Sequence, residues 1–247
     1  MISSLHKNAT SCARLAELIF FPSFCELCSS LLELPHEKVI CRTCLQSLKP
    51  RHSSFCLCCG RFFDDTGEPH FCQKCLQKRP TFSCHRSCGQ YNGKLKDVIL
   101  LFKYRKFMVL GKDLARFAYR TLRNEEALWW GVEAVVPVPL HPKKKKQRGF
   151  NQAFIIAKEL AMLKGIKLVE GHLVKLKNIL PQTSLKAEDR EKNVKGAFGI
   201  KEREKIEGKV ILLVDDVYTT GSTIRECSSV LKNAGAKDVR ALTLARA

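Results

Sequence analysis

One segment in the C-terminal half, KVILLVDDVYTTGSTI, constrains the fold of this chain more than any other. Its run from Val210 to Val214 is apolar at every position, which is typical of a strand covered on both faces within a mostly parallel sheet. Asp215 and Asp216 end that run, and a turn rich in hydroxyl groups leads to a helix that begins at Gly221 or Ser222. Because ligands bind at the carboxyl ends of such strands, we expect the functional site here.

The turn has the chemistry of a phosphate site. Gly221 lets the backbone approach a ligand closely, and the unpaired amides of the first helical turn point toward an anion. Hydroxyl donors come from Thr219, Thr220, Ser222 and Thr223. Because two carboxylates repel a bare phosphate, we expect Asp215 and Asp216 to address a ribose diol, with or without a divalent cation. The prediction is a ribose 5-phosphate derivative as ligand, and a plain acidic cap after a buried strand is the alternative.

Alternating helices and strands are predicted from about Thr81 onward. Apolar residues recur at helical spacing in residues 93–106, 111–124 and 151–165, whereas β-branched runs occupy residues 133–140, 208–217 and 237–245. The segment TFSCHRSCGQY is interpreted as a strand that enters this domain. The alternation predicts an α/β fold with a mostly parallel sheet.

Eight cysteines ahead of this domain follow a duplicated pattern. Cys25 and Cys28 are followed, after twelve residues, by Cys41 and Cys44, and the pattern returns 31 residues later at Cys56, Cys59, Cys72 and Cys75. A two-residue gap aims both sulfurs of a turn at one ion, and two such turns complete a tetrahedral thiolate shell around zinc. We therefore predict two structural zinc sites. Pairing across the repeat, or one degenerate site, is the alternative.

The other five cysteines are expected to be free thiols that act as small buried apolar residues, namely Cys12, Cys58, Cys84, Cys88 and Cys227. A third metal site at Cys84, His85 and Cys88 is disfavoured. Thirteen cysteines in a chain without a secretion signal favour metal ligation over disulfides, because the cytosol keeps thiols reduced.

Charge and hydropathy limit which partners and which location are expected for this protein. The net charge of +19, concentrated in segments such as HPKKKKQRGF and LFKYRKF, predicts contact with nucleic acid or phosphate-rich small molecules, with a solvated basic surface as the alternative. No stretch approaches the ~20 apolar residues of a membrane helix. No small-residue cleavage site follows the short apolar run near Phe20, so we expect a cytoplasmic protein whose residues 1–22 form an amphipathic helix.

The C-terminal string resembles the thirteen-residue fingerprint of type I phosphoribosyltransferases. This resemblance implies that Asp215 and Asp216 hold the 2- and 3-hydroxyls of phosphoribosyl diphosphate, and that magnesium accompanies the ligand. It assigns the 5-phosphate to the loop residues Thr219, Thr220, Gly221, Ser222 and Thr223.

Further segments, VVPVPLHPKKKKQRGFNQA, PQTSLKAEDREKNVKGAF and LFKYR, together with the cysteine pattern, resemble the ComF family, also called the GntX family, over nearly the whole chain. This resemblance implies a double zinc ribbon at residues 23–80 followed by a type I phosphoribosyltransferase fold at residues 81–247. Arg148 and Gln152 then lie on the diphosphate side of the ligand. The polar segment with Gln182, Arg190 and Asn193 corresponds to the flexible loop that closes over bound substrate.

Family membership implies phosphoribosyl diphosphate binding, a phosphoribosyltransferase activity, and a role in DNA uptake during natural transformation. The acceptor is not evident, because no base-recognition segment follows the fingerprint strand before the chain ends one strand later. The alternative is a non-catalytic protein that handles single-stranded DNA on the same fold. Recruitment of a helicase or another competence protein by the zinc ribbons is a further hypothesis.

Overall fold

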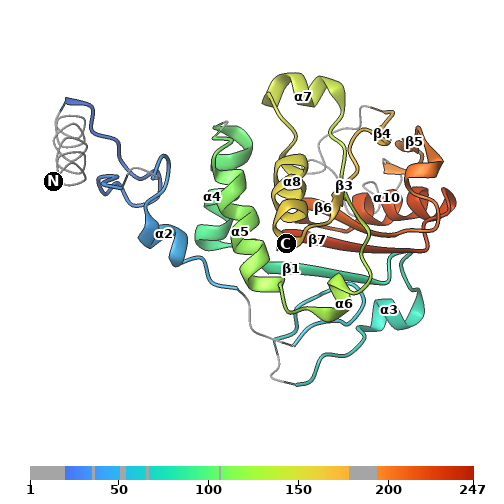
Figure 1. The fold of residues 1–247 in the computed structure, drawn as a ribbon. Coiled ribbons are helices and arrows are strands. Elements are labelled where there is room, and N and C mark those ends of the chain that lie inside the picture. Colours follow the sequence, from blue (N-terminus) through green and yellow to red (C-terminus); the bar gives the residue numbers. More distant parts are fainter. Residues whose placement is uncertain (1–19, 35–36, 51–53, 65–66, 106, 178–193) are drawn as a thin grey trace, which may run out of the picture. The chain divides into compact units, whose positions relative to one another are not determined.

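The computed structural model describes residues 20–34, 37–50, 54–64, 67–105, 107–177 and 194–247 (Figure 1). They divide into two compact units, one ending at Leu48 and one beginning at Lys49. The division falls between the two cysteine repeats, so the second repeat belongs to the same unit as the sheet. A domain boundary at residue 80 stays a prediction, and the helix expected at residues 1–22 lies almost wholly outside the described residues.

A five-stranded parallel sheet forms the centre of the second unit (Figure 1). Its strands, in spatial order, are β1 (Cys84–Gln90), β7 (Asp238–Arg246), β6 (Val210–Tyr218), β2 (Ala134–Pro137) and β3 (Lys167–Leu168). All four neighbouring pairs are parallel. The predicted mostly parallel sheet is therefore confirmed, with the three β-branched runs as β2, β6 and β7 and the segment after Thr81 as β1.

The three predicted helical segments form α4 (Gly93–Tyr104), α5 (Leu110–Leu122) and α8 (Gln152–Lys164). The helix predicted to begin at Gly221 or Ser222 forms α10 (Ser222–Asn233), and the structure adds α6 (Glu126–Trp129). α5 and α8 pack against each other, and α8 also packs on β2 and β6. In the described part of the chain no helix is long and apolar enough to cross a membrane.

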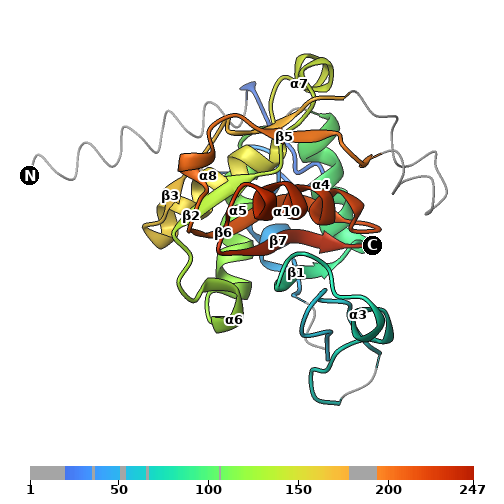
Figure 2. The ribbon, with the colours of Figure 1, turned by 90° about the vertical axis from the view of Figure 1, so that its right-hand side faces the viewer.

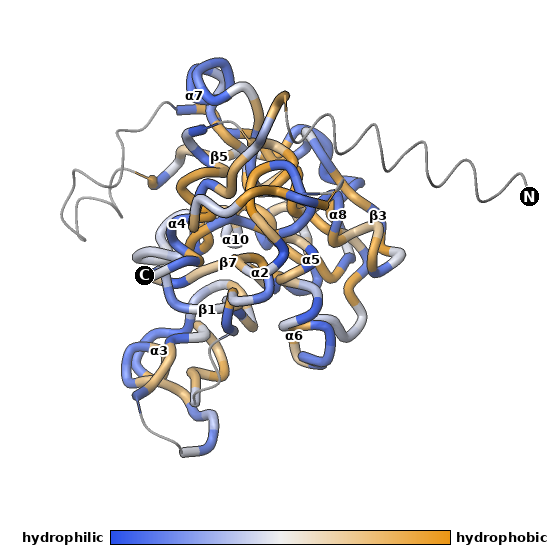
Figure 3. Tube along the Cα trace, turned by 90° about the vertical axis from the view of Figure 1, so that its left-hand side faces the viewer, coloured by the Kyte–Doolittle hydropathy of each residue, from blue (hydrophilic) through white to orange (hydrophobic). Residues whose placement is uncertain are grey.

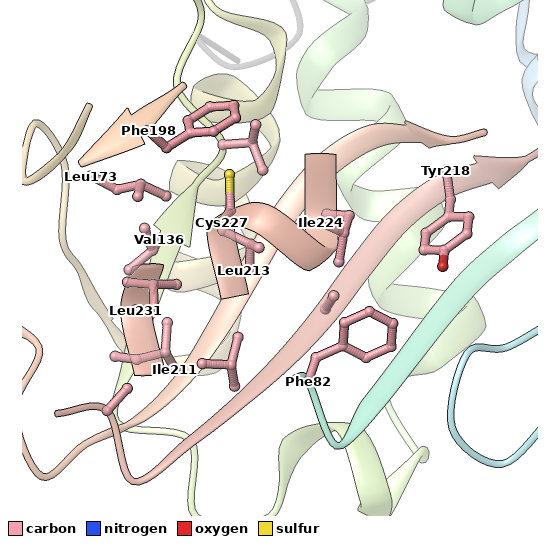
Figure 4. Close-up of a cluster of buried hydrophobic side chains, with 14 of the residues drawn as sticks. Phe82, Val136, Leu173, Phe198, Ile211, Leu213, Tyr218, Ile224, Cys227 and Leu231 are labelled. Atoms are coloured by element: carbon pink, nitrogen blue, oxygen red, sulfur yellow. The ribbon is translucent and has the colours of Figure 1, made fainter. Parts of the chain in front are cut away.

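Both faces of β6 are buried, which explains its continuous apolar run. Ile211 and Leu213 face Cys227 and Leu231 of α10 (Figure 4). Leu212 alternates to the opposite face and is equally buried. The burial of Cys227 among these side chains agrees with its expected role as a small apolar residue.

Two further elements flank the sheet. An antiparallel pair, β4 (Leu173–Lys175) and β5 (Phe198–Ile200), contributes Leu173 and Phe198 to the core beside α10 (Figure 4). The lysine run after β2 forms a short helix, α7 (Pro142–Arg148), which is hydrophilic along its length (Figure 3). Caps define both ends of this helix, since His141 Nδ1 accepts from the Lys143 amide and Gly149 ends the helix with φ 85°.

Candidate ligand pocket and metal centres

Strand β6 and helix α10 meet at the predicted phosphate loop (Figure 2). β6 continues to Tyr218, so Asp215 and Asp216 lie within the strand and not after it. The strand extends because β6 keeps its pairing with β7 as far as the pair Tyr218 and Arg246. Gly221 then caps α10 with φ 77°, and the helix begins at Ser222, one of the two predicted starts.

A pocket of about 290 Å³ lies at the carboxyl ends of β2 and β6. Seven of the nine predicted substrate-binding residues line it: Asp215, Asp216, Thr219, Gly221, Thr223, Arg148 and Gln152. Thr220 lines a neighbouring groove, and its hydroxyl lies 3.0 Å from that of the buried Ser222. Gln182, Arg190 and Asn193 fall outside the described residues. The binding roles of all these residues stay predictions.

Lys103 is a pocket residue that the sequence analysis missed. Its ammonium lies 2.9 Å from Asp216 Oδ1, and the two side chains are only 14% and 13% exposed. Burial opposes the charge of Lys103, yet attraction to Asp216 and Asp215 outweighs it and raises the pKa of the lysine. The segment LFKYR contained the signal, but a lysine in the last turn of a helix resembles an ordinary solvated side chain.

Asp215 is the most perturbed acid of the pocket. Burial raises its pKa to about 7, the neighbouring Asp216 adds to the shift, and Lys103 and Lys175 oppose it. The pKa of an aspartate in an unfolded chain is about 4. The folded protein therefore holds this proton more tightly than the unfolded chain does, and the associated stability is lost as the pH rises from about 4 through about 7.

We accordingly expect Asp215→Asn to stabilise the protein in a pH-dependent way. The difference in melting temperature between variant and wild type should grow from pH ~4 to pH ~7 and then level off, because asparagine has no proton to lose. Thermal denaturation across this range measures it, and Asp238→Asn, on the same sheet but outside the pocket, controls for general effects of pH. A constant difference across the range would refute the assigned burial effect.

Two clusters of four cysteines lie outside this pocket, each built within one repeat. The first consists of Cys25, Cys28, Cys41 and Cys44, the second of Cys56, Cys59, Cys72 and Cys75, and the sulfurs of each set lie within 4.8 Å of one another. The Cys28 and Cys41 sulfurs are 3.7 Å apart and those of Cys59 and Cys72 are 3.8 Å apart. Zn–S bonds of about 2.3 Å give a tetrahedral edge of roughly 3.8 Å. Both clusters therefore fit zinc, and pairing across the repeat is wrong.

The backbone around the clusters repeats with the same offset. The Cys41 amide donates to Cys25 Sγ and the Cys72 amide to Cys56 Sγ, both at 3.3 Å. Such amide donors favour the thiolate form that metal ligation requires. Equivalent antiparallel bridges join Phe24 to Leu31 and Phe55 to Phe62. The internal duplication read from the sequence is therefore structural as well.

The remaining described cysteines join neither cluster. Cys58, Cys84, Cys88 and Cys227 are buried, and Cys12 lies outside the described residues. His85, which separates Cys84 from Cys88, directs its Nδ1 to the Cys59 carbonyl and its Nε2 to the Thr243 hydroxyl. Both ring nitrogens of His85 therefore already have hydrogen-bond partners within the described residues.

Known proteins resemble both parts of this chain. The family model "Double zinc ribbon domain" matches residues 16–76, and "Phosphoribosyl transferase domain" matches residues 146–247. Competence protein F of Haemophilus influenzae is 29% identical over 92% of this chain and 99% of its own length. Competence protein ComFC of Streptococcus pneumoniae is 30% identical over 79% of this chain and 90% of its own.

A third relative decides the assignment. DNA utilization protein YhgH of Salmonella typhi is 30% identical over 93% of this chain and 99% of its own length. The similarity thus runs through the ribbons and the transferase domain together, and does not stop at either. This chain therefore belongs to the ComF family, together with competence protein F, ComFC and YhgH.

Proposed function

We propose that this protein binds phosphoribosyl diphosphate in the pocket at the end of β6 and acts as a phosphoribosyltransferase in DNA uptake. One observation carries the proposal: an acidic pair and the N-terminus of α10 line the same pocket as several basic side chains. Asp215 and Asp216 match the ribose diol, and the amides of the first turn of α10 match the 5-phosphate.

Basic and polar side chains across the pocket suit the diphosphate. Burial lowers the pKa of Lys175 and of Lys144, so an anion would relieve the cost of holding their charge. Gln152 is 2% exposed, and its Nε2 has no hydrogen-bond partner within the described residues, although its Oε1 accepts from Arg148. A buried amide donor that faces a pocket without a partner supports an oxygen-rich ligand there.

Magnesium fits the same pocket as a companion of the ligand. Carboxylate and diphosphate oxygens are its preferred ligands, and the ion would neutralise charge on the leaving diphosphate. The Lys103 ammonium already pairs with Asp216. We therefore propose that Lys103 and magnesium together balance the negative charge of Asp215 and Asp216.

The proposed reaction joins an acceptor nucleophile to C1 of the ribose. The nucleophile forms the new bond as the bond from C1 to the diphosphate oxygen breaks, and the diphosphate leaves with the electron pair. The pocket residues would contribute by orienting the ligand and by stabilising negative charge on the departing group. The pocket residues would recognise phosphoribosyl diphosphate and not the acceptor. Binding of this ligand and its turnover are therefore tested separately.

Equilibrium dialysis with phosphoribosyl diphosphate labelled in its diphosphate separates the two. We expect one ligand per chain, and labelled free diphosphate once a mixture of nucleobases and amines supplies the acceptor. If the ligand binds but releases no diphosphate with any acceptor, the transferase activity is rejected and the binding function stands. Absence of binding at millimolar ligand would reject both.

Gly221→Ala should weaken ligand binding in addition to the stability that it loses through backbone strain. An alanine at φ 77° loses roughly 1–2 kcal/mol, and the added Cβ would overlap the Tyr218 ring, which displaces the loop. Gly171→Ala is the matched control, because Gly171 has φ 82° and open space around the added atom. Urea denaturation should show a loss of stability in both variants. Affinity for phosphoribosyl diphosphate should fall about tenfold or more only at Gly221.

A second candidate function, handling of single-stranded DNA, is supported by a basic groove within the second unit. The groove, of about 800 Å³, lies between the second cysteine cluster and the phosphate loop. Six cationic side chains line it: Arg61, Lys74, Lys78, Arg79, Arg225 and Arg246. Charge of this density along a groove suits a nucleic-acid strand. The names of the relatives refer to competence and DNA utilization, which agrees with this candidate. A cytoplasmic location and a helicase partner stay predictions.

Oligonucleotide titrations at several salt concentrations test this candidate. Each lost phosphate contact lowers the salt slope by about 0.7 for a single strand. The double variant Lys74→Gln with Lys78→Gln should therefore reduce the slope by roughly 1.4. Neutralising Lys143 to Lys146 tests whether the strand instead binds along α7. Unchanged binding in both variants, or no binding at low salt, would reject the candidate.

A further inference from the structure

The second cysteine cluster touches the sheet through the buried side chain of His85. Within the second unit, His85 Nδ1 lies 2.9 Å from the carbonyl oxygen of the proposed zinc ligand Cys59. Because a carbonyl only accepts, Nδ1 carries the proton of this hydrogen bond. The His85 amide also donates to the Cys58 carbonyl at 2.7 Å. The turn that carries Cys59 is thereby tied to β1 at two points.

Arg246 binds the same carbonyl from the neighbouring strand. Its Nη1 donates to the Cys59 oxygen at 2.7 Å, so this one oxygen receives hydrogen bonds from both β1 and β7. Arg246 also lies opposite Tyr218 in the register of β6 and β7. A change in the position of Cys59 would therefore reach both side chains that flank Tyr218.

Tyr218 is in contact with both of those side chains. Its ring stacks on the His85 ring with centroids 4.3 Å apart, and the Arg246 guanidinium lies 4.3 Å from its centroid. The tyrosine is 4% exposed and projects from β6 into the core (Figure 4). Stacking and cation–π contacts of this kind each contribute on the order of 1 kcal/mol, so they fix the ring orientation.

The ring of Tyr218 in turn supports the phosphate loop. Gly221, the N-cap of α10, lies so close to the tyrosine ring that any added Cβ would overlap it. Movement of the ring would therefore displace the backbone whose amides begin α10. Cys59, His85 with Arg246, Tyr218 and Gly221 form a continuous series of contacts from the metal centre to the loop.

We propose that the second cysteine cluster positions the phosphate loop through His85, Arg246 and Tyr218, so that zinc bound there sets the affinity of the loop for its phosphate ligand. The identity of that ligand rests on the proposed function, whereas the coupling is a property of the chain itself. All contacts in the series lie within residues 49–247. The equivalent first cluster belongs to the other compact unit and provides an internal control.

Substitutions of Arg246 test the coupling without touching a metal ligand. In the full zinc-loaded chain, Arg246→Met and Arg246→Lys should each weaken phosphoribosyl diphosphate binding about tenfold, because neither keeps the planar bond to the Cys59 carbonyl together with the stack on Tyr218. Arg240→Met, on the same strand and paired with Asp238, should bind normally. Rescue by lysine would show that only charge matters and would overturn the proposal.

Exchange of amide hydrogens in the ligand-free protein tests the role of the metal. Cys72→Ser and Cys41→Ser are equivalent positions of the two repeats, and each should lose one zinc by native mass spectrometry. Only Cys72→Ser should accelerate exchange in residues 219–224, by about tenfold. Unchanged exchange there after loss of the second zinc would overturn the proposal.

The coupling stays testable if Cys72→Ser does not fold or if the wild-type protein does not bind phosphoribosyl diphosphate. If circular dichroism shows that Cys72→Ser does not fold, the Arg246 variants decide, since exchange in the loop must still accelerate in both of them. If the wild-type protein fails to bind phosphoribosyl diphosphate, the proposed function falls. The exchange measurement then still decides the coupling, because it requires no ligand.

Discussion

Replacing Asp215 and Asp216 together by asparagine is expected to abolish binding of phosphoribosyl diphosphate. Both carboxylates face the pocket, and hydrogen bonds from sugar hydroxyls to an ionised acceptor contribute roughly 1.5–3 kcal/mol each. Loss of two such bonds corresponds to a decrease in affinity of at least about 100-fold. Asparagine keeps the size of the side chains, so the change removes charge and leaves the volume of the pocket nearly intact.

The sign of the effect separates recognition from repulsion. If the acidic pair only repelled an anionic ligand, its neutralisation would tighten binding, and calorimetric titration would show a lower dissociation constant. Asp238→Asn is the control, because Asp238 pairs with Arg240 away from the pocket. Asp215→Asn is expected to stabilise the fold above pH ~7, whereas Asp216→Asn removes the charge partner of Lys103. Thermal denaturation of the double variant therefore accompanies the titration and shows whether the protein is folded where binding is lost.

Replacing Cys59 by serine should cost one zinc ion and the fold of the second ribbon, whereas the same change at the adjacent Cys58 should cost neither. Cys59 belongs to the cluster of four sulfurs, and structural zinc contributes roughly 10–16 kcal/mol to the folding of small metal-bound modules. Cys58 is buried outside the cluster, its sulfur near the Phe82 carbonyl at 3.8 Å, and burial raises its pKa to about 11. Its replacement should cost about 1 kcal/mol.

Native mass spectrometry and limited proteolysis measure this pair of variants. We expect two zinc ions in the wild type and in Cys58→Ser, and one in Cys59→Ser, with new cleavage among residues 54–80. Loss of zinc from Cys58→Ser would show that the ligands are assigned to the wrong cysteines. Two retained ions in Cys59→Ser would show the same.

Local patterns explain most of what the sequence predicted correctly. The spacing of Cys56 and Cys59 is set by one tight turn, and the apolar run of β6 by burial on both faces of a strand. The loop at Gly221 combines a strand, a turn and a helix start in one short segment. Each of these features depends on neighbours in sequence, so a single chain suffices to recognise it.

Features that depend on distant contacts were missed. Lys103 joins the pocket only because α4 brings it to Asp216, 113 residues further along the chain. The strand β3 has two residues, too few for a periodic pattern, and the extension of β6 to Tyr218 requires the partner strand β7. A metal site at His85 was disfavoured from the sequence, but only the fold shows that both nitrogens of its ring already have hydrogen-bond partners.

Protection of backbone amides by phosphoribosyl diphosphate tests most directly whether the loop after β6 holds the ligand. Hydrogen exchange of the zinc-loaded chain, with and without saturating ligand and magnesium, reports every amide at the start of α10. We expect slower exchange in residues 219–224 and no change in the first cysteine repeat. Unchanged exchange in residues 219–224 under conditions where the ligand is bound would contradict the assignment of this loop as the phosphate site.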